Sequence, residues 1–96
     1  LDGLADIPDV RLYGIADPDR LGARCPTFGL THARIDAASL ARRLADEGIF
    51  CWSGDFYALE VVRALGLEPD GMLRVGMLHY NTAREVDRLL TALADA

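Results

Sequence analysis

The sequence predicts an α+β domain, with a mostly antiparallel sheet of about four strands and helices on one face. Two strand-like segments, 10–15 and 27–34, are separated by too few residues for a helical crossover, so they should pair as antiparallel neighbours. Two further strand patterns alternate with helical patterns along the chain. The expected order is β-β-α-β-α-β-α in one domain, because 96 residues suffice to bury one core.

The strand pair is expected near the beginning of the chain. Pro8 favours an extended backbone before it, so an initial helix or linker should stop there. Residues 10–15 alternate in polarity as a strand does, and residues 17–22 have the composition of a loop. Residues 27–34 form the second expected strand. Three of its alternate side chains should lie on one side of the sheet: Phe28, Leu30 and His32.

Two helices and a third strand are expected in the middle of the chain. Asp36 is a suitable N-cap for a helix with apolar side chains at helical spacing, and Gly48 is a suitable stop. The apolar run 49–52 predicts a short, well-buried strand that is broken at 53–55. A second helix is expected at about 56–65, followed by a turn.

Residues 73–82 predict a strand, a two-residue corner and the start of a helix. Leu73, Val75 and Met77 alternate with other residues at the period of a strand, and His79 continues the pattern. Thr82 and Glu85 have the spacing of a capping box. An apolar stripe at helical spacing follows: Val86, Leu89, Leu90 and Leu93.

Arg74 stands inside this otherwise apolar strand and has two interpretations. It is either an edge arginine whose aliphatic stem covers apolar surface, or a clamp that binds a carboxylate through two parallel hydrogen bonds. Spacing alone leaves both open.

The histidines, Cys51 and an aromatic loop are the other candidates for chemistry. His32 and His79, expected in different strands, are interpreted as structural histidines, because nothing nearby in sequence is positioned to tune them. Cys51, within an apolar run, is interpreted as an inert buried thiol. Four residues cluster where the third strand leads into the next helix: Trp52, Asp55, Phe56 and Tyr57. Such a loop can line a pocket, but Phe56 and Tyr57 also fit the apolar face of that helix, and both interpretations stay open.

Composition excludes several classes of protein. The net charge is −5 and the longest basic cluster is a pair, which argues against a nucleic-acid partner. No apolar run is long enough to span a membrane.

Two cysteines without metal-ligand spacing fit a reducing, cytoplasmic environment. The chain contains no lysine and begins with Leu1, so we expect a piece of a longer enzyme that cannot form a Schiff base at its own side chains.

Four segments in a fixed order carry a family resemblance: 7–14, 26–28, 46–49, and 74–82 with Glu85, Val86 and Asp87. The last segment is the most specific, because an arginine in a strand precedes Tyr-Asn-Thr and an acidic, capped helix. With these segments the chain resembles, over essentially its whole length, the C-terminal small domain of the class V aminotransferases. These are pyridoxal-phosphate-dependent enzymes of fold type I, and the similarity is greatest to their cysteine desulfurase-like branch.

The resemblance implies that a large domain outside this chain holds the Schiff-base lysine and most contacts to pyridoxal phosphate. It also implies a homodimer acting on an amino or keto acid, and an inactive fragment when residues 1–96 are alone. Arg74 matches the family arginine that binds the substrate α-carboxylate. Three residues are candidates for the pocket wall: Trp52, Asp55 and Tyr57.

The loop after the third strand departs from the pattern of one group of true cysteine desulfurases. Tyr57 stands at the position of their sulfur-accepting cysteine, Asp55 and Phe56 replace a histidine pair, and Trp52 replaces an arginine. Efficient desulfuration of that type is therefore not expected. An alternative from another class is a free-standing, non-catalytic α+β module for dimerisation or small-ligand binding.

Overall fold

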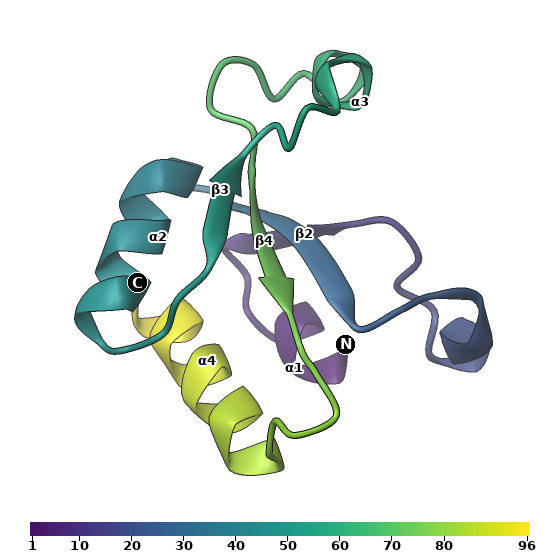
Figure 1. Cartoon of the computed structure of the whole chain (residues 1–96), viewed down its shortest axis with the longest axis vertical. Helices are drawn as coiled ribbons and strands as arrows, with labels where there is room; N and C mark the ends of the chain where they lie inside the picture. The colour runs from purple at the N-terminus through teal and green to yellow at the C-terminus, as the bar shows by residue number, and fades with distance from the viewer.

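The computed structural model describes residues 1–96 and has a four-stranded antiparallel sheet at its centre (Figure 1). The strand order is β1-β2-β4-β3, so β2 and β4 are central and β1 and β3 are edges. This architecture confirms the predicted α+β class and the antiparallel first pair. In chain order the elements are α1 (Asp2–Ala5), β1 (Val10–Tyr13), the 3-10 helix η1 (Pro18–Ala23), β2 (Thr27–His32), α2 (Ala37–Asp46), β3 (Trp52–Gly54), α3 (Leu59–Ala64), β4 (Met72–Gly76) and α4 (Ala83–Asp95).

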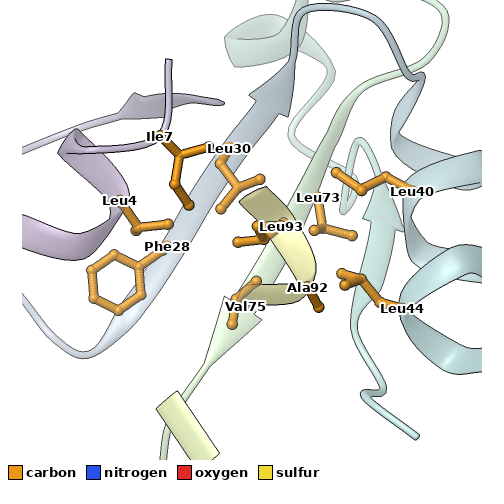
Figure 2. Packing of buried hydrophobic residues seen from close by; sticks show 10 residues of the cluster. All are labelled: Leu4, Ile7, Phe28, Leu30, Leu40, Leu44, Leu73, Val75, Ala92 and Leu93. Atoms are coloured by element: carbon orange, nitrogen blue, oxygen red, sulfur yellow. The ribbon is translucent and has the colours of Figure 1, made fainter. Parts of the chain in front are cut away.

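Three helices cover one face of the sheet and enclose the core. Figure 2 shows side chains of α1, α2 and α4 meeting those of the central strands in a single apolar cluster. The remaining α-helix, α3, lies beyond the ends of β3 and β4, away from this cluster (Figure 1). The largest fully buried side chains come from β2, α2, β4 and α4: Leu30, Leu40, Leu44, Leu73 and Leu93.

Strand β2 has the polarity that its sequence predicts. Phe28, Leu30 and His32 are buried, while the residues between them lie on the other face of the sheet. The ring Nδ1 of His32 accepts a hydrogen bond from the backbone N–H of Arg34 at 3.2 Å. His32 is therefore a buried histidine with a backbone partner, as a structural role requires.

The third strand differs from its prediction in position and in burial. The predicted buried strand 49–52 is wrong, because β3 runs over Trp52–Gly54 and pairs on one side only, with β4. Ile49 and Cys51 pack partly against the core, whereas Phe50 and Trp52 are 85% and 68% exposed. Trp52 pairs directly with the exposed Arg74 and so lies on the face that the helices do not cover, and composition alone does not reveal that this face is open.

The central strand also ends earlier than predicted. β4 stops at Gly76, and the extension of the strand to His79 is wrong. The side-chain Oδ1 of Asn81 accepts from the backbone N–H of Leu78 at 2.8 Å, so a turn replaces the strand. His79 lies in this turn, exposed, with its ring edge-on to that of Tyr80.

Two smaller segments also differ from their predictions. The loop expected at 17–22 is largely the 3-10 helix η1, which the Asp17 carboxylate caps by accepting from the backbone N–H of Asp19 at 2.9 Å. The second predicted helix, 56–65, is shortened to α3, because Phe56 and Tyr57 have positive φ angles of 55° and 63°. A helix cannot include residues in this left-handed region.

The two longest helices begin at the predicted caps. The Asp36 carboxylate accepts from the backbone N–H of Ser39 at 2.9 Å, and Thr82 and Glu85 form a complete capping box. A hydrogen bond from the Asn81 side chain, and then bonds from Thr82, hold the pKa of the Glu85 carboxyl below its ordinary value. The charged form of Glu85 is therefore favoured in the folded state.

This lowered pKa predicts a pH dependence of stability. Because the folded pKa lies below the unfolded one, the contribution of Glu85 is complete above the ordinary glutamate value of about 4.3 and is lost as the pH falls below it. In urea titrations, the free energy of unfolding of Glu85→Gln should therefore fall less than that of wild type when the pH is lowered from about 6 to about 3. Asp87→Asn, which removes a carboxylate without a hydrogen-bond partner from the same helix, is the matched control. An unchanged pH slope in Glu85→Gln would contradict this account.

Candidate functional site

Arg74 lies on the face of the sheet that no helix covers. Its neighbours in β4, Leu73 and Val75, are buried in the core, so the alternation of the strand directs Arg74 to the opposite face, where it is exposed. Its partners across the ladder are Gly29 in β2 and Trp52 in β3. The arginine therefore stands on a central strand, between two hydrogen-bonded neighbours that fix its backbone.

The guanidinium group of Arg74 rests on an aromatic ring and has no polar partner in the chain. Its Cζ atom lies 4.5 Å from the ring centroid of Phe56. The ion pairs of the chain are made by other arginines, Arg34 and Arg63, and Arg74 donates no side-chain hydrogen bond. A guanidinium has five N–H donors, so this arrangement leaves all of them available to an anionic ligand.

An open hollow of about 430 Å³ lies beside this arginine. Of the three candidate wall residues, Trp52 lines it, whereas Asp55 and Tyr57 do not. The Asp55 carboxylate instead accepts from the backbone N–H of Tyr57 at 3.0 Å, and the Tyr57 side chain is fully exposed. The residues around the hollow are Thr27, Phe50, Cys51, Trp52, Arg74 and Gly76.

The contact between Phe56 and Arg74 could not be predicted from sequence spacing. Sequence spacing places Phe56 on the pocket loop or in the next helix, and neither assignment pairs it with a strand residue far along the chain. Its left-handed backbone, which bulky side chains rarely adopt, turns the loop so that the ring lies under the guanidinium. No local pattern signals a left-handed phenylalanine.

The left-handed conformation of Tyr57 predicts a stabilising substitution. Tyr57 has a φ of 63° and a fully exposed side chain, so Tyr57→Gly relieves backbone strain without losing a buried contact. After the greater entropy of glycine in the unfolded chain is subtracted, the net gain should be about 0.5–1 kcal/mol in chemical denaturation. Ala58→Gly, at a φ of −92°, should bring no gain. Loss of stability in Tyr57→Gly would contradict this view of the loop.

Cys51 is the thiol next to the candidate site, and its environment disfavours reactivity. It lines the hollow beside Arg74 and is half-buried, and burial raises the pKa of its thiol. Cys25, in contrast, is exposed. Because the thiolate is the nucleophile, Cys51 is poorly suited to accept sulfur or attack a substrate.

The two cysteines can be compared directly by alkylation. With iodoacetamide at pH 8, the Cys25→Ser variant, which keeps only Cys51, should react several-fold more slowly than Cys51→Ser, which keeps Cys25. Mass spectrometry against time gives both rates, and unfolding in urea should make them equal. Faster reaction of Cys51 in the folded chain would show an activated thiol beside Arg74.

The hollow between β4 and α4 has no unpaired charged group comparable to Arg74. A hollow of about 200 Å³ lies between β4, α4 and residues 48–51, but its polar side chains already have partners. Asn81 is bonded to Glu85, and Arg88 donates to the backbone carbonyl of Glu47. No three His, Cys, Asp or Glu side chains gather to hold a metal ion. None of the helices has both the length and the apolar character needed to cross a bilayer.

The fold and the site together define a class of protein: an α+β sheet domain with one helix-covered face and an exposed arginine beside an open hollow on the other. The family model for class V aminotransferases matches residues 1–89. The chain belongs to this family.

Individual relatives agree with this assignment. The chain is 38% identical over 93 residues to a protein named cysteine desulfurase from Escherichia coli, and 33% identical over 97 residues to an aminotransferase-like protein from Gibberella zeae. Each match covers 97% of this chain but only 21% and 23% of the relative. The chain thus spans about a fifth of the length of these curated relatives.

Solved structures give the same result. The apo structure of a cysteine desulfurase from Thermococcus onnurineus matches 98% of the chain with a TM-score of 0.85 and 26% identity. The cysteine desulfurase CsdA from Escherichia coli matches 98% with a TM-score of 0.79 and 26% identity. These matches cover 22% and 21% of the respective structures.

Proposed function

We propose that residues 1–96 are the C-terminal small domain of a longer pyridoxal-phosphate-dependent enzyme that acts on an amino or keto acid. In this proposal Arg74 binds the α-carboxylate of the substrate. The observation that carries it is the position of Arg74: a guanidinium on a central strand, exposed on the open face and without a hydrogen-bond or ion-pair partner within the chain.

The geometry of Arg74 suits a carboxylate better than a structural role. An arginine that only covers apolar surface does not need unpaired N–H groups. Here no N–H donor of the Arg74 side chain has a hydrogen-bond partner within the chain, and its Cζ lies over the ring of Phe56. Two parallel charge-assisted hydrogen bonds from one guanidinium hold a carboxylate in a defined orientation. Because the strand fixes the Cα, little backbone order has to be gained when the ligand binds.

The residues of this chain do not make the covalent cofactor site. The family uses pyridoxal phosphate, which is bound as a Schiff base to lysine, and this chain contains no lysine. We therefore propose that the lysine and the main cofactor contacts lie in the large domain. By the same resemblance we propose that the complete enzyme is a homodimer.

The reaction of the complete enzyme is proposed to differ from cysteine-loop desulfuration. That chemistry requires a mobile, nucleophilic thiol on the loop after β3. Tyr57 stands at the matching position, and Cys51 is half-buried with a raised pKa. Because neither residue provides such a thiol, the role that we propose for this chain is the binding and orientation of substrate.

Substitution of Arg74 in the full-length protein tests the proposal. Arg74→Ala should lower kcat/KM for an amino-acid substrate by about 10²-fold or more, since each bond to a charged group is worth about 1.5–3 kcal/mol. Arg74→Lys keeps the charge but loses the fork, so it should have an intermediate effect. Steady-state kinetics give both values, and amine analogues without a carboxylate should be almost unaffected by either change.

Arg84→Ala is the matched control, because Arg84 is an exposed arginine without a polar partner at the start of α4, and it does not line the hollow. It should leave kcat/KM unchanged. Wild-type kinetics in Arg74→Ala, or unfolding of that variant, would assign Arg74 a purely structural role and refute the proposal.

A further inference from the structure

We propose that Phe56 is a positioning residue that holds the guanidinium of Arg74 in the orientation needed to bind a carboxylate. The inference rests on the proposed role of Arg74 and adds a second residue to it. It starts from the cation–π contact of Arg74, whose Cζ lies 4.5 Å from the ring centroid of Phe56. A cation over an aromatic face is attracted by the quadrupole of the ring.

The backbone around Phe56 is arranged so that this contact forms. The Asp55 carboxylate accepts from the N–H of Tyr57 at 3.0 Å, and the Asp55 carbonyl accepts from the N–H of Ala58 at 2.8 Å. These bonds close a tight turn in which Phe56 and Tyr57 are both left-handed. Strained bulky residues persist only where the surroundings hold them, and they concentrate at functional sites.

The two consecutive left-handed residues have different surroundings. The Tyr57 side chain is fully exposed, whereas Phe56 is half-buried and lies against Arg74. The turn thus directs one ring to the guanidinium and the other to solvent. This difference assigns the positioning role to Phe56 and not to its neighbour.

A stacked ring orients an arginine without using its hydrogen-bonding edge. An acidic partner would hold Arg74 equally well, but it would occupy the N–H donors and compete with a substrate carboxylate. The Phe56 ring lies 4.5 Å from Cζ and has no acceptor oxygen, so it does not take up the N–H donors as a carboxylate would. Trp52, the cross-strand neighbour of Arg74, makes no such contact and is 68% exposed.

A double-mutant cycle in the full-length protein tests the inference, with L-alanine as the carboxylate probe and ethylamine as the probe without one. Binding is followed through the change in absorbance of the cofactor. Phe56→Leu should weaken binding of L-alanine about two- to fivefold, the range expected for an exposed cation–π contact. Binding of ethylamine should not change. Phe56→Tyr keeps the aromatic face and should bind L-alanine as wild type does.

The coupling to Arg74 separates positioning from a general effect on the fold. In an Arg74→Ala background, Phe56→Leu should cause no further loss of L-alanine binding, because the group that it orients is absent. An equal loss in both backgrounds would overturn the positioning role while leaving the carboxylate clamp intact. Failure of the wild-type protein to bind L-alanine, or undiminished binding in Arg74→Ala, would overturn the clamp and with it the positioning role. Tyr80→Leu removes an exposed aromatic ring outside the hollow and should show no coupling.

A second measurement is independent of cofactor and substrate. In NMR spectra of the chain, the ring of Phe56 should shift the side-chain Hδ and Hε resonances of Arg74 upfield. Phe56→Leu should remove this shift, and Phe56→Tyr should retain it. Arg74 resonances at ordinary positions in the wild-type chain would refute the stacking that the proposal requires.

Discussion

The central position of β4 is the constraint on which the rest of this domain depends. Hydrogen bonds to β2 on one side and β3 on the other fix the strand, so its side chains alternate strictly between two environments. Leu73 and Val75 enter the core beneath α1, α2 and α4, and Arg74 is thereby forced onto the open face. One short strand thus supplies both the centre of the core and the charged group of the candidate site.

The two faces of the sheet differ in what covers them, and the candidate site lies on the face without helices. On the covered face, apolar side chains of the helices pack against those of the central strands. On the open face, Gly29 and Trp52 flank Arg74, and the turn after β3 brings Phe56 under the guanidinium. The pairing of β3 with β4 makes this possible, because it places the turn after β3 next to the strand that carries Arg74.

Local signals predicted much of the fold, since they depend on residues close together in sequence. The capping box of Thr82 and Glu85, the cap at Asp36 and the inward side of β2 all follow from spacing of a few residues. The prediction of a buried third strand is wrong because an apolar run does not reveal that one face of the sheet has no helix over it. The extension to His79 failed because the Asn81 side chain competes for the backbone there.

The sequence by itself determined the fold class, the family and the prominence of Arg74, an arginine in an apolar strand before a capped helix. Only the tertiary structure decided that this arginine has free N–H donors, that Trp52 lies beside it while Asp55 and Tyr57 do not line the hollow, and that Phe56 supports it. The physical reason is that these relations join segments far apart in the chain. They depend on strand order and on two left-handed residues, neither of which leaves a periodic pattern in the sequence.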